Sequence, residues 1–431
     1  MKKILDRLID DFHERDIPEP IPRQVSVNEV QGKANVVIGM RRAGKTWFCY
    51  QKMRELMAKG VAKERLLYLN FEDERLLPFS AHDFQEILET YYRKFPQFKN
   101  QVCYLFLDEV QRIEGWDKFV RRVLDFEKLQ VWVTGSSSKL LGSEIATSLR
   151  GRSLTIEIFP FSFKECLRYH GIELKTTAQF GSRSRATLQH MAEKYLTTGG
   201  FPEVQTLDDE ARRQIHRNYL DVVILRDVVE RHTVSNTSAL RTMIHHIMAA
   251  PAARFSVNRF YNSLKSQGIA CTKNDLYLFL DYLVEAFLIY PVIIHSRSFK
   301  ARQLNPKKMY AIDTGLLNST SFHMMEDRGA LLENLVYMHL RRQGLQAEYY
   351  MTATGSEVDF LVPSGKGGKP LLIQVCWSLD KSETKKREET ALQQTMKELA
   401  VKRGTIITWL DEVSAGKNIE VIPAWKWLLT G

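Results

Sequence analysis

The sequence has few cysteines, and they form no recognisable group. Its 431 residues include five, which are far apart and occur in no CxxC or Cys/His pattern: Cys49, Cys103, Cys166, Cys271 and Cys376. The odd number and wide spacing suggest neither a disulfide framework nor a zinc site. We therefore expect the protein to work in a reducing compartment, the cytoplasm.

Long hydrophobic runs are missing as well. No window approaches the roughly 20 uncharged apolar residues that a membrane-spanning helix needs. The N-terminal stretch MKKILDRLIDDFHERDIPEP has apolar residues at helical spacing but is interrupted by charges throughout. The sequence therefore predicts a soluble protein with no membrane partner. With 44% hydrophobic residues, the chain is long enough for about two to four domains, each with its own core.

Acidic residues are scarce in one part of the chain. The net charge is +10, and between Ala211 and Tyr310 there are 15 Lys and Arg residues against 6 Asp and Glu, a difference of +9. Positive charge concentrated on one module is typical of proteins that bind the nucleic-acid backbone, although basic surfaces also serve solubility or protein partners. On charge alone, DNA and protein partners both remain open.

A phosphate-binding loop is present near the N-terminus. The stretch NVVIGMRRAGKTWFCY places an apolar run before a complete GxxxxGK[ST] pattern, and a helical pattern follows. The backbone N–H groups of such a loop surround phosphate oxygens, the lysine reaches the β- and γ-phosphates, and the threonine hydroxyl coordinates Mg²⁺. The sequence therefore predicts ATP and Mg²⁺ as cofactors, Lys45 as a catalytic residue, and nucleotide contacts from Gly39, Arg42, Ala43, Gly44, Lys45, Thr46 and Trp47.

An acidic pair ends a later apolar run, QVCYLFLDEVQ. At the carboxyl end of a parallel strand, Asp108 would hold Mg²⁺ together with Thr46, and Glu109 would polarise the attacking water. We therefore expect hydrolysis rather than binding alone. A further run, LQVWVTGSSSKLL, places Thr134 or Ser136 where a hydroxyl would sense the γ-phosphate or orient the water; a cap on the following helix is the alternative.

Two arginines follow this core in the stretch SEIATSLRGRSLTIEIFPFSFKE. Related ATPases often project an arginine finger from this position into a neighbour's nucleotide site. Arg150 or Arg152 would then make activity depend on oligomerisation. An ion pair within one subunit is the alternative interpretation.

The basic middle segment predicts a helix-turn-helix. Apolar residues recur at helical spacing on both sides of the break SQGIACTKND, and an apolar strand and the basic tip HSRSFKARQLNPKK follow as a wing. Lys273 and Asn274 would open the recognition helix, and Arg297, Lys300 and Arg302 on the wing would contact DNA phosphates. Packing against neighbouring subunits is the alternative.

The C-terminal stretch GSEVDFLVPSGKGGKPLLIQVCWSL predicts a hairpin that carries Asp359 and Gln374, and the preceding helix ALLENLVYMHLRRQG carries Glu333. This layout resembles nucleases in which a helix Glu, a strand Asp and an E/QxK strand surround one or two metal ions. Cys376 stands where those nucleases have their lysine, and a thiol cannot supply a fixed cation. We therefore expect a degenerate nuclease-like site, with weak metal-dependent cleavage as the alternative.

Stretches along nearly the whole chain resemble one bacterial and archaeal family: AAA-type P-loop ATPases joined to a winged helix and a C-terminal domain of unknown function with a nuclease-like fold. The stretches are GMRRAGKT, LFLDEVQRIEGWDKFVRRVLD, VTGSSSKLL, LRGRS, FPFSFKE, TTGGFPEV, VVILRDVVERH, KKMYAIDTGL, LLENLVYMHL, GSEVDF and IQVC. The resemblance implies an α/β fold: an AAA+-like P-loop core, a helical lid, a winged helix-turn-helix and a restriction-endonuclease-like α/β domain. We place these at residues 1–165, 166–235, 236–320 and 321–431.

The resemblance also implies an oligomer, for which we expect a ring of six subunits. Together with the basic segment, it favours Mg²⁺-dependent ATP hydrolysis coupled to binding, remodelling or translocation of DNA, including branched DNA. The alternatives are an ATP-gated metal-dependent nuclease and a nucleotide-controlled switch that binds proteins.

Overall fold

The computed structural model describes residues 1–28, 30–135, 149–173, 180–320, 327–364 and 368–430. Backbone contacts divide the chain into two compact units, Met1–Phe159 and Pro160–Gly431. The first unit ends at Phe159, a little before the boundary at 165 that we expected from the sequence. None of the helices formed by the described residues combines the length and the apolar character that a membrane span requires.

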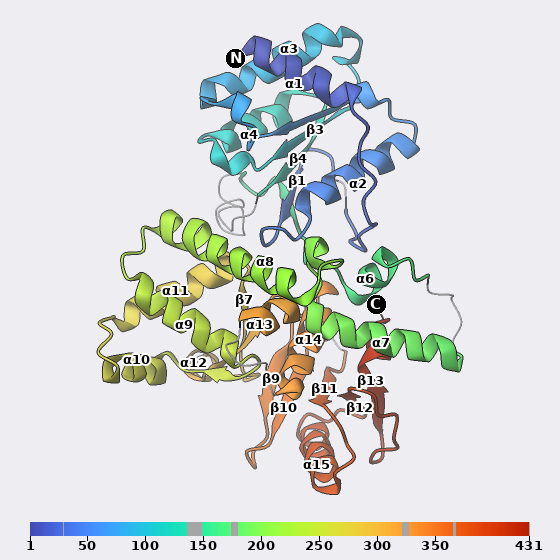
Figure 1. Cartoon of the computed structure of the whole chain (residues 1–431), viewed down its shortest axis with the longest axis vertical. Helices are drawn as coiled ribbons and strands as arrows, with labels where there is room; N and C mark the ends of the chain where they lie inside the picture. Colours follow the sequence, from blue (N-terminus) through green and yellow to red (C-terminus); the bar gives the residue numbers. More distant parts are fainter. Residues whose placement is uncertain (29, 136–148, 174–179, 321–326, 365–367, 431) are drawn as a thin grey trace. The chain divides into compact units, whose positions relative to one another are not determined.

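A parallel five-stranded sheet forms the centre of the first unit (Figure 1). Its strands are β1 (Ala34–Ile38), β2 (Leu66–Asn70), β3 (Cys103–Asp108), β4 (Leu129–Thr134) and β5 (Ser153–Glu157). They lie in the order β2-β3-β4-β1-β5, and every neighbouring pair is parallel. The carboxyl ends of β1, β3 and β4 therefore meet at one edge, which is where open parallel sheets bind ligands.

The helices of the first unit are α1 (Lys2–Glu14), α2 (Lys45–Ala58), α3 (Phe84–Lys94) and α4 (Trp116–Phe126). Their apolar residues and those of the sheet form the core, since parallel strands must be covered on both faces. The N-terminal helix α1 lies beside α3 (Figure 1), and ion pairs of Arg93 with Asp6 and of Lys94 with Asp10 join the two. Short 3-10 turns complete the unit: η1 (Lys63–Arg65), η2 (Glu74–Leu76), η3 (Ala81–Asp83), η4 (Pro96–Phe98) and η5 (Val110–Arg112).

The second unit begins with helices and contains two sheets. The helices are α6 (Phe163–Tyr169), α7 (Ser182–Thr198), η7 (Pro202–Val204), α8 (Asp209–Val222), the π-helix η8 (Val223–Glu230), α9 (Thr237–Ala249), α10 (Val257–Ser266), α11 (Lys273–Glu285), α12 (Phe299–Leu304), α13 (Thr314–Thr320), α14 (Arg328–Arg342), α15 (Ser382–Glu398) and α16 (Ala424–Trp427). The strands are β6 (Arg254–Phe255), β7 (Ile289–Val292), β8 (Lys307–Ala311), β9 (Glu348–Met351), β10 (Glu357–Val362), β11 (Leu371–Cys376), β12 (Gly404–Thr408) and β13 (Ile419–Pro423).

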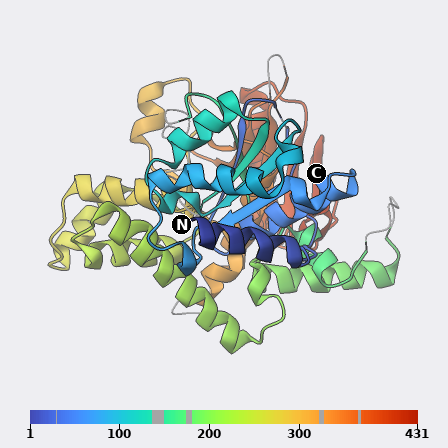
Figure 2. The same cartoon turned by 90° about the horizontal axis from the view of Figure 1, so that it is seen from above.

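The basic middle segment folds into helices α9, α10 and α11, which gather into one cluster (Figure 2), and an antiparallel sheet in the order β6-β8-β7. The break that we expected between two helices lies between α10 and α11, and Thr272 caps α11 with a capping box. Part of the basic stretch after β7, which we expected to form the tip of the wing, forms helix α12, whose N-cap Ser298 accepts a hydrogen bond from the Ala301 N–H. The identity of this segment as a winged helix stays a prediction.

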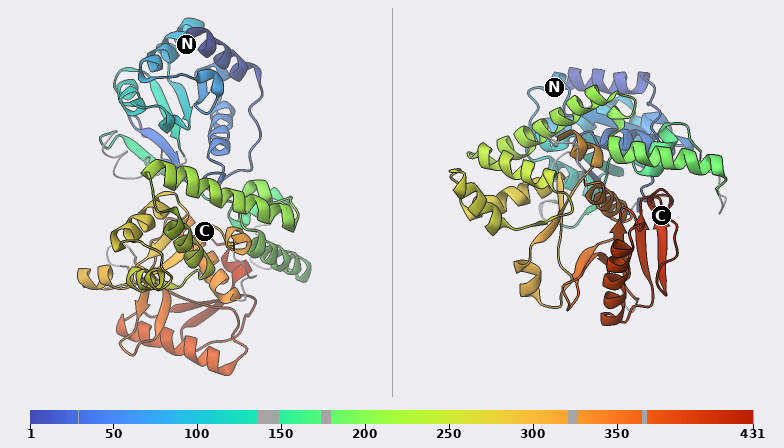
Figure 3. Two further views of the ribbon diagram at one scale, coloured as in Figure 1. Left: turned by 60° about the vertical axis from the view of Figure 1, so that its left-hand side comes forward. Right: turned by 60° about the horizontal axis from the view of Figure 1, so that its bottom comes forward.

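The C-terminal sheet has the order β13-β12-β11-β10-β9. Strands β10 and β11 form the expected antiparallel hairpin, with Phe360 opposite Ile373, whereas β11, β12 and β13 are parallel. Helix α15 lies along these strands (Figure 3) and packs its apolar face, including Leu392, against them. Helix α14, which carries Glu333, also packs against β11 and β8.

Candidate functional site

The loop between β1 and α2 takes a shape that two of its glycines permit. Gly39 has φ +140°, and a Cβ added there would lie 2.2 Å from the carbonyl oxygen of Ile158. Gly44, the N-cap of α2, has φ 99° in the left-handed region. An L side chain rarely adopts either conformation, so these glycines keep the loop close to the sheet and its backbone open at the helix N-terminus.

Lys45 lies in the first turn of α2 and is buried. Its Nζ donates to the carbonyl oxygens of Gly39 at 3.1 Å and Met40 at 3.2 Å, and it lies 4.0 Å from Glu109 Oε1. The loop thus holds one ammonium group at a helix N-terminus, where anionic phosphate oxygens are stabilised. Lys45 therefore lies where its ammonium group can contact a phosphate held by the loop.

Asp108 accepts three side-chain hydrogen bonds at the end of β3. Thr46 Oγ1 donates to its Oδ2 at 2.8 Å, Tyr68 OH donates to the same oxygen at 2.8 Å, and Thr134 Oγ1 donates to Oδ1. Burial raises the pKa of Asp108 above its ordinary value, and the hydrogen bonds from Thr134 and Thr46 oppose that rise. Thr46 and Asp108, the two residues expected to hold Mg²⁺, are therefore in direct contact.

Thr134 connects the two acidic residues. Besides donating to Asp108, its Oγ1 accepts a hydrogen bond at 3.0 Å from the backbone N–H of Glu109. Glu109 has φ 53° and accepts a hydrogen bond from Gln111 Nε2 through Oε2. Of the two hydroxyl residues that we considered, Thr134 lies at this edge of the sheet, and Ser136 lies outside the described residues.

One buried arginine beside the loop had no motif to identify it. Arg23 is buried, its Nη1 donates to the Ala43 carbonyl at 3.0 Å, and its backbone N–H donates to Gln51 Oε1 at 2.7 Å. Arg23 therefore fastens the N-terminal segment to the loop and to α2. Arg42 has φ 65°, and Trp47 on α2 is half exposed at 50%.

The two arginines of the stretch LRGRS differ in their surroundings. The guanidinium of Arg152 is paired with Asp125, at the end of α4, in the same subunit. Arg150 is exposed and has φ 49°. Arg152 therefore makes an ion pair within its own subunit while 43% of its side chain stays exposed, and Arg150 is exposed as well.

The DNA-contact candidates lie on or directly before two helices of the second unit. Lys273 and Asn274 are exposed in the first turn of α11, and Lys273 Nζ lies 5.4 Å from the centre of the Tyr261 ring. The other three, Arg297, Lys300 and Arg302, lie just before or on α12. Lys300 and Arg302 are therefore presented from a short helix, and Arg297 from the segment that precedes it.

The nuclease-like candidates meet a lysine that we did not anticipate. Lys308 of β8 is 3% exposed, and its Nζ lies 2.5 Å from Glu333 Oε1, 2.8 Å from Glu357 Oε1 and 3.0 Å from Asp359 Oδ1. Burial opposes its charge, but the carboxylates, Asp359 first, hold the pKa of Lys308 well above its ordinary value. Burial and the charge of Asp359 raise the pKa of Glu333 to about 8.

The other two motif residues of the hairpin, Gln374 and Cys376, make contacts within the protein core. Gln374 Nε2 donates to Glu388 Oε2 at 2.8 Å, and its Oε1 accepts a hydrogen bond at 3.3 Å from the Asp359 N–H. Cys376 lies in the apolar cluster with Leu372 and Leu392. Burial raises the pKa of the Cys376 thiol to about 11, so the thiol stays neutral and adds no charge to the site.

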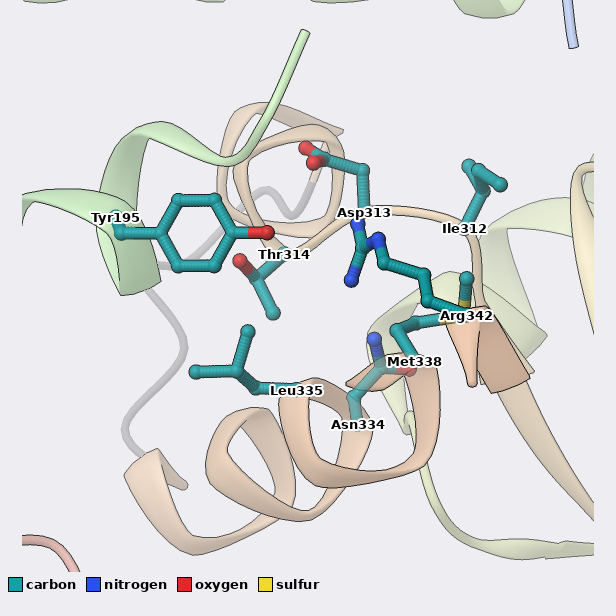
Figure 4. A pocket seen from close by; sticks show the side chains of 8 residues that line it. All are labelled: Tyr195, Ile312, Asp313, Thr314, Asn334, Leu335, Met338 and Arg342. Carbon is teal, nitrogen blue, oxygen red and sulfur yellow. The ribbon is translucent and has the colours of Figure 1, made fainter. Parts of the chain in front are cut away.

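A small cavity in the second unit lies where α7, α14 and the β8–α13 junction meet (Figure 4). Its volume is about 10 Å³, which is enough for about one water molecule and far below the size of a ligand pocket. Asp313 at its edge accepts backbone hydrogen bonds from Gly200 at 2.6 Å and Leu316 at 3.0 Å. The aspartate therefore fastens the TTGG turn to α13, and the cavity is a packing feature.

Three family models match successive parts of the chain. Residues 31–167 match the AAA domain, residues 189–326 match a domain of unknown function (DUF8612), and residues 328–427 match another domain of unknown function (DUF4143). The nucleotide-loop residues and the Asp108 cluster all fall in the first of these. The Lys308 cluster spans the other two, because Lys308 lies in the second and its three carboxylate partners lie in the third.

Similar proteins are known in archaea and bacteria. An uncharacterized protein of Methanocaldococcus jannaschii, MJ1544, is 35% identical over 444 residues, which cover 100% of this chain and 96% of that protein. An uncharacterized protein of Haemophilus influenzae is 30% identical over 349 residues, which cover 80% of this chain and 82% of that protein. Among solved structures, Cdc6p from Pyrobaculum aerophilum is similar at 12% identity with a TM-score of 0.24, over 78% of this chain and 93% of that chain. This last likeness is too loose to carry an argument.

MJ1544 matches this chain along its whole length, and the phosphate loop lies within the part of the chain that matches the AAA domain. The parallel sheet, with the loop after β1 and an acidic pair after β3, has the architecture of a P-loop AAA+ core. The chain therefore belongs to the family of AAA-domain P-loop proteins that includes MJ1544 of Methanocaldococcus jannaschii.

Proposed function

We propose that the protein is a Mg²⁺-dependent ATPase that couples hydrolysis to binding, remodelling or translocation of DNA as a ring of six subunits. One observation carries the ATPase part: the contact between Thr46 Oγ1 and Asp108 Oδ2 at 2.8 Å, with Lys45 Nζ 4.0 Å from Glu109 Oε1. These four side chains bring a phosphate-binding cation, the two residues suited to Mg²⁺ and a general base to one edge of the sheet.

Each of these residues has a distinct task. Thr46 and Asp108 would hold Mg²⁺, which when bound neutralises charge on the β- and γ-phosphates. Lys45 would exchange the loop carbonyls for phosphate oxygens. Glu109 would orient the attacking water and accept its proton, and Thr134 would keep Glu109 and Asp108 in their relative positions through its two hydrogen bonds.

An arginine finger would complete the site from a neighbouring subunit. Arg150 suits this role because it is exposed directly after the core, whereas Arg152 is engaged with Asp125 of its own subunit. A guanidinium that approaches the γ-phosphate stabilises the charge of the transition state. Turnover should therefore depend on protein concentration through ring assembly.

The DNA part of the proposal rests on the charge and exposure of the middle segment. It carries +9 of the net charge of +10, and Lys273 and Lys300 are exposed on α11 and α12. Exposed basic residues at the start of α11 and on α12 can contact DNA phosphates. Such binding weakens steeply with salt.

The test is steady-state ATP hydrolysis by the purified protein alone and with single-stranded, duplex and four-way-junction DNA, with Glu109→Gln as the blank. Stimulation by one DNA form supports the coupled motor and identifies its substrate. Lys273→Ala with Lys300→Ala should weaken that stimulation and lower the salt slope of binding by about 2, whereas Lys99→Ala, an exposed lysine of the first unit, should not. Turnover that ignores every DNA favours the nucleotide-controlled protein-binding switch.

A further inference from the structure

The nuclease-like layout of the C-terminal domain implies a divalent metal between Glu333, Asp359 and Gln374, and the geometry around Lys308 tests whether these residues fit one. An ammonium group has three N–H donors. Lys308 Nζ meets three carboxylate oxygens at 2.5–3.0 Å, from Glu333 on α14 and from Glu357 and Asp359 on β10. Each of the three N–H donors of the ammonium group can therefore bind one oxygen of one carboxylate.

The other atoms that a metal would need are engaged as well. Asp359 Oδ2 accepts the backbone N–H of Val375 at 2.9 Å, and Glu333 Oε1 also accepts the Tyr310 hydroxyl at 2.6 Å. Gln374 uses its amide nitrogen on Glu388 and its oxygen on the Asp359 N–H. Within the described ranges, no group of three or more His, Cys, Asp or Glu side chains is arranged to hold a metal ion.

Charge repulsion prevents the Lys308 ammonium and a divalent metal ion from occupying this site together. A divalent ion placed among the same oxygens would lie within about 4 Å of the ammonium, where like charges repel strongly because little water screens them. Lys308 is 3% exposed, so its side chain cannot turn into solvent without moving β8. A metal would therefore have to displace a charge that the fold holds in place.

We infer that Lys308 is the resident cation of the nuclease-like site: its ammonium takes the place of the divalent metal, so the C-terminal domain is complete without metal and does not cleave DNA. The same contacts give the site a structural task. They fasten β8, the strand that follows basic helix α12, to α14 and β10. The lysine therefore joins the three-stranded sheet of the basic segment to the C-terminal domain.

The test measures Mn²⁺ binding to the nucleotide-free, full-length protein by calorimetry. The four proteins are the wild type, Asp359→Asn, Lys308→Met and the Lys308→Met/Asp359→Asn double variant. Methionine keeps the length of the lysine stem and removes its charge. We expect Lys308→Met to gain one Mn²⁺ site per chain, with at least tenfold tighter binding than the wild type, and the double variant to lose it. Asp359→Asn alone should bind Mn²⁺ as the wild type does. Background binding at the nucleotide site therefore cancels when Lys308→Met is compared with the wild type and when the double variant is compared with Asp359→Asn.

Two results would overturn the inference. One is Mn²⁺ binding or Mn²⁺-dependent DNA nicking by the wild type that disappears in Asp359→Asn, because the carboxylates would then hold a metal beside Lys308. The other is a folded Lys308→Met that takes up no Mn²⁺, because the three carboxylates would then not form a cation site. If Lys308→Met unfolds at 25 °C in EDTA, millimolar Mn²⁺ should restore its folding, as should the charge-retaining Lys308→Arg; failure of both rescues would count equally against the inference. None of these outcomes depends on ATP turnover.

Discussion

Removal of the Thr134 hydroxyl tests how the acidic pair is positioned. Thr134→Val deletes the donor to buried Asp108 and the acceptor of the Glu109 N–H while the side-chain volume is kept. A hydrogen bond to a charged group contributes about 1.5–3 kcal/mol. If that amount is lost only in the transition state, kcat falls by about 10- to 150-fold at 1.36 kcal/mol per tenfold, and KM stays the same.

The assay is steady-state ATP hydrolysis over a range of ATP concentrations, with thermal unfolding measured in parallel. Thr134→Ser keeps the hydroxyl and should retain most of the activity. Thr90→Val is the matched control, because Thr90 is fully buried and its hydroxyl has no hydrogen-bond partner among the described residues. A Thr134→Val protein with wild-type kcat, or with its whole defect in KM, would show that the hydroxyl does not position the acidic pair.

Three further predictions concern the loop, acid stability and the finger. Gly39→Ala should abolish ATP binding in a titration and cost roughly 3 kcal/mol of stability, because its Cβ would lie 2.2 Å from a backbone oxygen; Gly60→Ala, with nothing within 4 Å, should cost only about 1 kcal/mol. Burial lowers the pKa of His216 to about 4. Between pH 6.5 and 4 the unfolded chain therefore binds a proton that the folded chain does not, and about 3 kcal/mol of the free energy of unfolding should be lost as the pH falls through this range. In melting curves His216→Gln should reduce this dependence of stability on pH, and an unchanged dependence would show that His216 is not its source. Arg150→Ala should lower kcat by at least about 100-fold in the assembled protein while Arg152→Ala has a small effect, and the reverse order would move the finger to the second arginine.

The geometry of the candidate nucleotide site was largely predictable, because its loop residues belong to one strand–loop–helix motif. A strand, a glycine loop and a helix fix Lys45 and Thr46 relative to each other, and parallel strands bring Asp108 to the same edge. The contacts of Thr134 with both acidic residues depend on the packing of β4 beside β3, which the sequence pattern alone does not give. Ser136, the other hydroxyl residue that we considered, lies outside the described residues. Arg23 belongs to no motif, since its contacts to the loop cross a long segment of chain.

The short helix α12 shows a different limit. The stretch after β7 is basic and polar, and with six residues in the helix there are too few turns for an apolar period to stand out. One local signal was present: Ser298 caps the helix through the Ala301 N–H, as a serine at a helix start commonly does. Lys300 and Arg302, which we assigned to the tip of the wing, therefore lie on a helix, and this changes which phosphates they can reach at once.

Lys308 could be anticipated only in part. The run KKMYA starts a strand in which Lys307 is exposed and the next four residues are buried. A lysine at the start of a buried strand needs a carboxylate partner, because an unpaired buried charge is too costly. Its partner Asp359 lies 51 residues further on and in another sheet, so no local pattern names it.

This separation changes how the cysteine at position 376 should be understood. In the E/QxK motif the lysine lies on the same strand as the Glu or Gln that precedes it. The carboxylates need only a positive charge at one point in space, and any element that reaches this point can supply it. Lys308 reaches the carboxylates from β8 with its ammonium 3.0 Å from Asp359. The cysteine therefore removes a lysine from the motif strand without leaving the carboxylates uncompensated. Lys308 contacts the carboxylates directly, as a metal ion would. If our inference about Lys308 holds, the site has lost the metal ion itself, and the change goes further than the loss of one motif residue.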